Sequence, residues 1–231
     1  MSTVITERAV LLLNPDADVE DPSSEAGKIM ANLLETVAAQ PGFVSGHWGR
    51  RVGIETNDVE HIVDWATLED HENLNNNPAI IEPMMADLEK IMRAEPPWYH
   101  INYYQQSSDN KKTPIPASAF LTPSKGPIIE MIVLHLSPTI PESDISSLET
   151  SWAGFARDEL RKADGCVCIG QGMVLEELER DGGKVKGYHI AVGWESEEKC
   201  AKFQRTLEES EKRFGTLVKG RESCLVTLRA Q

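Results

Sequence analysis

The six histidines are the residues of this sequence best suited to chemistry, because imidazole exchanges protons near neutral pH. His61 has the same strand parity as Val63 and Trp65, so the three side chains share one face of a predicted strand. His47 precedes Trp48 on another predicted strand, which sends one ring to each face. We therefore expect His61 and His47 to be the acid/base candidates. A hydrogen-bonded structural histidine is the alternative at each position.

A second group of side chains is expected to shape a binding pocket. In the predicted strand 98–105, His100 and Tyr104 share a face with Trp98, while tyrosine and isoleucine occupy the other face. Such mixed polar and aromatic faces are typical of ligand pockets. A strand at an interface between two halves of the chain is the alternative. The expected substrate-binding residues are Trp65, Trp98, His100, Tyr104, His189 and Trp194.

Other polar residues are expected to have structural or surface roles. His71 follows two acidic residues in the first turn of a predicted helix and is expected at the surface. His135 lies between two leucines and is expected in the core. The acidic stretch beginning at Glu176 predicts a solvated hairpin edge. The Gly170-Gln171-Gly172 run lacks the third glycine and following helix of a dinucleotide loop, so it indicates a bulge or a close backbone approach.

No metal site is expected. The histidines, cysteines and acidic residues do not show the spacing of metal ligands. Cys166 and Cys168 form a C-x-C pair on a predicted strand, which fits neither zinc nor a redox C-x-x-C motif. All four cysteines are therefore expected to be buried, reduced thiols of a cytoplasmic protein.

Composition narrows the classes of partner. The 231 residues include 23 Lys plus Arg and 37 Asp plus Glu, a net charge of −14, with 40% hydrophobic residues. This composition predicts a globular protein with a substantial core. The acidic balance argues against nucleic acid, which requires clustered basic residues. The sequence has no apolar run near the roughly 20 residues of a membrane span and no signal-peptide pattern, so we expect no membrane association.

The predicted elements occur twice in the same order. Residues 1–106 and 128–231 each read strand, helix, strand, strand, helix, strand, and a proline-rich linker at 107–127 separates them. The segment Trp65–Glu69 of the first unit corresponds to Trp194–Glu198 of the second. This order is ferredoxin-like and leaves one sheet face of each unit bare. The predicted fold is α+β, with two tandem ferredoxin-like repeats that pair their bare faces as an internal pseudo-dimer.

The sequence resembles the dimeric α+β-barrel superfamily, most closely its stress-responsive and antibiotic-biosynthesis-monooxygenase members. The resemblance rests on short motifs in both units and covers nearly the whole chain outside the linker. These motifs are Trp48-Gly49 within Phe43–Val52, His61–Asp64, Asn77-Pro78-Ala79, Gly187–Val192 and Trp194–Ser196.

The resemblance implies a central barrel cavity that binds apolar or aromatic metabolites. Family members include cofactor-free monooxygenases, plant-type polyketide cyclases, decarboxylases and haem-dependent relatives, with tandem fusions in fungal biosynthetic pathways. In the plant cyclases, two histidines act as acid and base. His61 matches the first of them, whereas Ile80 occupies the place of the second, and Glu130 occupies the place of a further histidine on the first strand.

We therefore expect a biosynthetic enzyme that needs no cofactor. It would cyclise, isomerise or oxidise an apolar polyketide- or terpenoid-like intermediate by histidine acid/base chemistry in the barrel cavity. The alternative is a non-catalytic stress-responsive or small-molecule-binding barrel. The expected assembly is a monomeric pseudo-dimer or a homodimer.

Overall fold

The computed structural model describes residues 4–53, 55–106, 111–121, 128–211, 215 and 217–231. The first half of the chain contains β1 (Ile5–Leu11), α1 (Glu25–Ala38), β2 (Phe43–Val52), β3 (Val59–Trp65), α2 (Leu68–Asn75), α3 (Pro78–Ile91) and β4 (Trp98–Gln106). The second half contains β5 (Lys112–Pro114), η1 (Ala117–Ala119), β6 (Ile128–Leu136), α4 (Glu142–Asp158), η2 (Leu160–Lys162), β7 (Cys166–Arg180), β8 (Gly183–Trp194), α5 (Glu197–Glu211) and β9 (Val218–Ala230).

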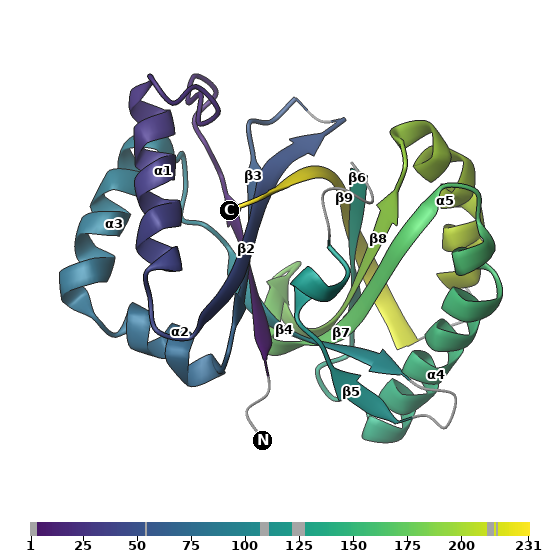
Figure 1. The fold of residues 1–231 in the computed structure, drawn as a ribbon. Helices are drawn as coiled ribbons and strands as arrows, with labels where there is room; N and C mark the ends of the chain where they lie inside the picture. Colours follow the sequence, from purple (N-terminus) through teal and green to yellow (C-terminus); the bar gives the residue numbers. More distant parts are fainter. Residues whose placement is uncertain (1–3, 54, 107–110, 122–127, 212–214, 216) are drawn as a thin grey trace.

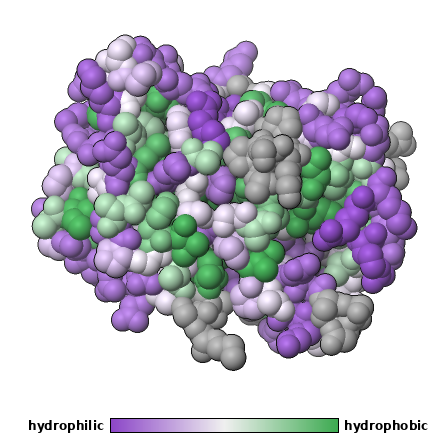
Figure 2. Space-filling view, in the orientation of Figure 1, coloured by the Kyte–Doolittle hydropathy of each residue, from purple (hydrophilic) through white to green (hydrophobic). Residues whose placement is uncertain are grey.

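The strands form one antiparallel sheet that closes on itself. Their order is β1-β3-β2-β9-β6-β8-β7-β4-β5, and β1 also pairs with β4. Helices α1, α2 and α3 cover the sheet on one side and α4 and α5 on the other (Figure 1). In the view of Figure 2, polar side chains cover most of the two helical layers. The predicted α+β class with a large antiparallel sheet is confirmed. No helix among the described residues is long and apolar enough to cross a bilayer.

Strand pairing follows the same register in both halves. Ile5 of β1 lies opposite Trp65 of β3, and Ile128 of β6 lies opposite Trp194 of β8. The strand order is β4-β1-β3-β2 in the first half and β9-β6-β8-β7 in the second. Each residue on β1 and β3 therefore has a matching position on β6 and β8, which allows the two halves to be compared side chain by side chain.

Side chains fill much of the interior of the closed sheet. Residues that alternate inward from both halves form a common core, among them Ile62, Ile101, Met131 and Val226. Two further cores lie between the outer sheet face and the helices, one in each half. The large side chains of the common core restrict the space for a ligand in the middle of the barrel.

Part of the predicted linker plugs one end of the barrel. The backbone N–H groups of Ala117 and Ser118 donate to the Asp64 carboxylate at 2.8 and 2.9 Å. Phe120 is buried in the common core, and a Cβ on Gly170 would lie 2.1 Å from its ring. The predicted close approach at Gly170 is thus confirmed, and residues 111–121 are more than a spacer. The rest of the predicted linker, 107–110 and 122–127, lies outside the described residues.

Candidate active site

A pocket of about 120 Å³ lies on the outer face of the sheet in the first half, beneath α1, α2 and α3. Leucine, valine and methionine side chains from the three helices form its walls. Four polar side chains face it from strands and α2, namely Glu7, His61, His71 and Asn75, and the exposed Glu95 between α3 and β4 is a fifth. An apolar cavity of roughly 150 Å³ holds benzene, so this pocket of about 120 Å³ approaches the size of one six-membered ring. An apolar enclosure with a few convergent polar groups is typical of a small-molecule site.

A chain of hydrogen bonds leads from the molecular surface to this pocket. The Glu176 carboxylate on β7 lies 2.6 Å from His100 Nδ1 and also accepts the His100 backbone N–H at 2.8 Å. His100 Nε2 lies 2.7 Å from His71 Nδ1. The Glu176 side chain is 34% exposed, whereas both imidazoles are almost fully buried. The second half of the chain thus supplies the outer end of a relay whose inner end lies in the first half.

The relay determines which nitrogen of each ring carries the proton. A carboxylate only accepts, so His100 donates from Nδ1 to Glu176; when both imidazoles are neutral, His100 Nε2 accepts from the Nδ1–H of His71. His71 Nε2 then carries a lone pair, which accepts the amide N–H of Asn75 at 3.1 Å. The tautomers follow from the hydrogen-bond network. The result is a neutral imidazole with its basic nitrogen at the pocket.

Burial disfavours the charged forms of the groups at the pocket. Desolvation, reinforced by His100, lowers the pKa of His71 to about 4. Burial also raises the pKa of Glu7, against the opposing effects of His61 and of a 3.0 Å hydrogen bond from Trp65 Nε1. Glu7 Oε2 lies 3.2 Å from His71 Nε2. A carboxyl group with a raised pKa and an imidazole with a lowered pKa can exchange a proton at small energetic cost.

His61 forms a second basic group of the pocket. Its Nε2 lies 3.1 Å from the Oε1 atom of Gln231. The amide nitrogen of Gln231 donates to the backbone carbonyl of Leu34, which fixes the orientation of the amide and makes His61 Nε2 the donor. Burial lowers the pKa of His61, partly offset by Glu7.

The structure brings four of the expected site residues together. His61 and Trp98 line the pocket, and His100 lies directly behind His71. Trp65 is fully buried, with its ring centroid 5.3 Å from that of His71. Trp98 is 48% exposed and lies edge-on to His71 and His100, at centroid distances of 6.0 and 5.6 Å.

The other four expected residues lie elsewhere. His47 faces the barrel interior opposite Ile62, near Asp64, and burial lowers its pKa. His189 is also inside the barrel, where its Nδ1 lies 2.9 Å from the Tyr103 hydroxyl. The remaining two pack in the second half, Tyr104 through its hydroxyl contact with Tyr188 and Trp194 through its hydrogen bond to Glu130. The eight residues therefore do not form one constellation.

Three residues of the pocket and relay were missed from the sequence. His71 is 3% exposed, so the expectation of a surface histidine is wrong. Glu176 was assigned to a solvated hairpin edge, yet it holds His100. Glu7 was overlooked, although it alternates with Ile5 and Ala9 on the buried face of an apolar strand, a signal that an acidic group faces the core.

The structure gives less support to a metal ion or to a reactive cysteine at this site. Among the described residues, no group of three or more His, Cys, Asp or Glu side chains is arranged to hold a metal ion. The four cysteines are free thiols, but only Cys200 is buried and the other three are half-buried, so the expectation that all four are buried is wrong. Burial raises the pKa of Cys200 above its ordinary range.

No family model matches the chain, and no curated protein matches it. Several solved structures do. An anthrone oxidase-like protein matches 100% of this chain and 94% of its own, with a TM-score of 0.67 and 12% identity. A monooxygenase-like protein from Lactobacillus acidophilus NCFM matches 99% and 95%, with a TM-score of 0.58 and 9% identity. The chlorite dismutase-like protein TA0507 matches 99% and 96%, with a TM-score of 0.59 and 14% identity. At such identities the likeness shows that this chain has the α+β fold of these monooxygenase-like and dismutase-like proteins.

Proposed function

We propose that the chain is a tandem repeat of one ferredoxin-like unit. Residues 1–106 and 128–231 form the two repeats, and 107–127 joins them as an intramolecular version of a dimeric α+β barrel. The equal strand order and the equal register of Ile5–Trp65 and Ile128–Trp194 support this division. Each repeat covers the bare sheet face of the other, so the chain is expected to act as a monomeric pseudo-dimer.

The first repeat carries the activity, which is removal of a proton from carbon in an apolar substrate. The observation that carries this proposal is the position of His71, which lines an apolar pocket and whose Nδ1 lies 2.7 Å from His100 in a relay that ends at Glu176. Loss of a proton next to a carbonyl group is a common first step of cyclisation, isomerisation and cofactor-free oxygenation. An imidazole in a water-poor pocket can provide that step without a cofactor.

In the proposed step, His71 Nε2 takes the proton and becomes an imidazolium. Its Nδ1–H, donating through His100 to the Glu176 carboxylate, stabilises the new positive charge. The substrate carbon keeps the electron pair as an enolate. Glu7, whose carboxyl group lies 3.2 Å from His71 Nε2, starts protonated, gives its proton to the product and is then reprotonated by the imidazolium. His61 assists as a hydrogen-bonding group in the same pocket. One ring of the substrate fills the pocket, and its remainder lies along the exposed Trp98.

Oxygenation is the form of this chemistry that the fold neighbours favour, since monooxygenases and an anthrone oxidase-like protein share the fold. For an anthrone, the enolate reacts with O₂. The ring CH₂ becomes C=O, one O₂ is consumed and one water is released. Both electron pairs of the two C–H bonds go to oxygen, so no other oxidant is required.

Anthrone itself is a suitable probe, because deprotonation and oxygenation can be followed separately. In D₂O under nitrogen, NMR measures exchange of the anthrone CH₂ protons. In air, absorbance measures anthraquinone. We expect wild-type protein to accelerate exchange over buffer, and His71→Gln to lose at least 100-fold of that acceleration. Cys200→Ala changes the matching position of the second half and should keep it.

Exchange at the buffer rate in the presence of wild-type protein would refute the enzymatic proposal. If anthrone then still quenches tryptophan fluorescence in a manner that requires Trp98, the alternative function applies. In that case the chain is a non-catalytic small-molecule-binding barrel.

A further inference from the structure

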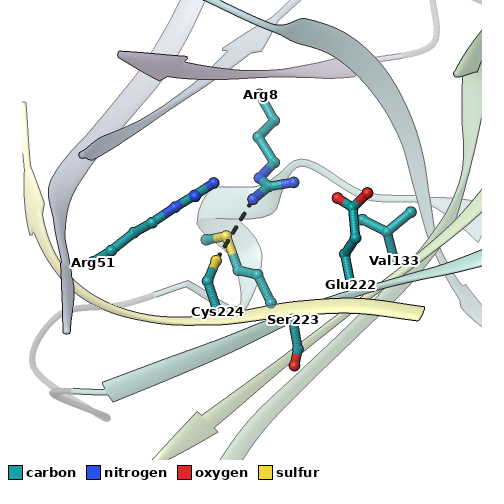
Figure 3. Close-up of a pocket in the computed structure, with 7 residues that line it drawn as sticks. Arg8, Arg51, Val133, Glu222, Ser223 and Cys224 are labelled. Carbon is teal, nitrogen blue, oxygen red and sulfur yellow. Dashed lines mark hydrogen bonds between the residues drawn. The ribbon is translucent and has the colours of Figure 1, made fainter. Parts of the chain in front are cut away.

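The barrel has a second cavity, on the opposite face of the sheet from the His71 pocket. It measures about 240 Å³ and lies at the end of the barrel that the 111–121 segment does not plug. Its lining residues are Arg8, Arg51, Met131, Val133, Glu222, Ser223 and Cys224. Figure 3 shows Arg8 and Arg51 reaching into this space from the side opposite Cys224 and Val133.

The cavity wall carries an excess of positive charge. Arg8 and Arg51 both bind Glu60, at 2.8 and 2.7 Å from its Oε1 atom. The next carboxylate, Asp58, lies 2.6 Å from Arg93 and 3.7 Å from Arg51. The two arginines that line the cavity, Arg8 and Arg51, therefore share one carboxylate, that of Glu60, within a chain whose net charge is −14.

The negative charge of Glu60 is held by its neighbours. Burial alone raises the pKa of this carboxyl group, but Arg8 and Arg51 together bring it below the ordinary value. The Arg8 and Glu60 side chains are 7% and 0% exposed. One positive charge thus remains with little access to water, an arrangement that an anion would stabilise.

The other polar groups of the cavity do not neutralise this positive charge. Glu222 lies at the rim, where its charge is matched by Arg180, with Nη2 at 2.9 Å from Oε2. His135 also lies 3.3 Å from the Glu222 carboxylate. Burial, reinforced by Glu60, raises the pKa of Cys224 to about 12, so this side chain remains a neutral thiol. It receives a 3.6 Å contact from Arg8 Nη2.

We propose that this cavity binds a small organic carboxylate. The carboxylate lies between the guanidinium groups of Arg8 and Arg51, where charge-assisted hydrogen bonds are strongest. The apolar body of the ligand lies on Met131 and Val133, which belong to the common core of the barrel. A volume of about 240 Å³ exceeds the roughly 150 Å³ that holds benzene, so a benzoate-sized anion fits. The site is independent of the proton-transfer chemistry proposed above.

Calorimetric titration with benzoate at fixed ionic strength tests this assignment. We expect saturable binding to wild-type protein that weakens as KCl is added. Arg51→Met should weaken benzoate at least tenfold. Arg50→Met is the matched control, because Arg50 is the next residue on β2 but points to the other face and pairs with Glu20 at 2.7 Å. Its affinity should stay within twofold of wild type.

Thermal unfolding of unmodified protein gives a second readout, so the test does not depend on a variant that folds. Benzoate that binds the folded chain should raise its melting temperature as the benzoate concentration rises. Failure of benzoate to bind would overturn the proposal, as would equal loss in Arg50→Met and Arg51→Met. Binding of inorganic phosphate in place of benzoate would also overturn it and identify an inorganic anion site.

Discussion

The two halves of the molecule place the same acid–tryptophan pair at the same point of the sheet, yet surround it differently. Trp65 donates to Glu7 at 3.0 Å, and Trp194 donates to Glu130 at 3.3 Å. In the first half, His71 lies 3.2 Å from the glutamate. In the second, Cys200 occupies the equivalent place, four residues after the capping serine, and donates to Glu130 at 3.5 Å.

A second set of matched positions also differs between the two halves. Ala9 lies opposite His61 in the first half, where Ile132 lies opposite Ile190 in the second. Both isoleucines are fully buried. Because the glutamate–tryptophan pair is common to both halves, it does not by itself distinguish them. The proposed function depends on what the first half has in addition, namely His61 and His71 and the pocket that they line.

The largest effect is expected when the first half receives the residues of the second. The double variant Ala9→Ile, His61→Ile adds the bulk of Ile132 and Ile190 to the pocket. Anthrone exchange should fall at least 100-fold, because the substrate ring is excluded. The free energy of unfolding should rise by about 1 kcal/mol, since apolar burial replaces a desolvated imidazole. Exchange within threefold of wild type would show that the pocket is not the site.

The pH dependence of the unfolding free energy distinguishes His71 from a cysteine at the same position, which is the residue that the second half has at position 200. The pKa of His71 is about 4 when folded and near 6.5 when unfolded. Between these values the unfolded chain binds more protons, so the free energy of unfolding falls as the pH drops from 6.5 to 4. This group contributes a loss of up to about 3 kcal/mol, which is complete below pH 4.

Urea unfolding between pH 7 and pH 4 measures this loss. The variant His71→Cys, which imports the residue of the second half, should show a visibly shallower slope. The raised pKa of Glu7 acts in the opposite direction and is present in both proteins. Identical slopes for the two proteins would contradict the burial of a neutral His71.

The reverse substitution, which gives the second half a histidine from the first, is expected to lower the unfolding free energy. Ile190→His introduces an imidazole into a filled core without the partner that Gln231 provides for His61. We expect a loss of about 2–3 kcal/mol in unfolding free energy, measured with urea, and no gain of anthrone exchange. Ile190→Val, the control for volume, should cost about 1 kcal/mol. Equal costs for the two substitutions would mean that the second half tolerates polar groups as well as the first.

The smallest effect is expected for Glu176, the residue of the second half that binds His100 of the first half. Glu176→Gln removes the charge behind His100, which weakens His71 as a base and should slow anthrone exchange about tenfold. The pH of half-maximal exchange should shift downwards, because Glu176 raises the pKa of His71. Glu177→Gln, at an exposed residue paired with Lys184, is the control. A slower rate with an unchanged pH profile would assign Glu176 a purely structural role.

Strand parity allowed much of the fold and part of the site to be predicted. It places His61 with Trp65, and His100 with Trp98, on shared faces, as the structure does. Parity does not reveal which face has a hollow, so His47 and His189 were grouped with the site although they lie inside the barrel. That distinction depends on helix packing, which local sequence does not encode.

Long-range pairing explains the remaining errors. Glu176 resembles a surface residue in its own segment, and only the pairing of β4 with β7 brings it to His100. His71 resembles a surface residue because its neighbours in α2 are polar, but α2 turns this one face towards the sheet. Both contacts join positions far apart in the chain.

The tautomer of His71 tests the central claim most directly. Nitrogen-15 NMR of the side chains, with one histidine substituted at a time for assignment, distinguishes a protonated from an unprotonated ring nitrogen. At pH 7 we predict that His71 and His100 both carry the proton on Nδ1 and that His71 Nε2 is unprotonated. A His71 ring protonated at Nε2, or at both nitrogens, would contradict the account, because no basic nitrogen would then face the pocket.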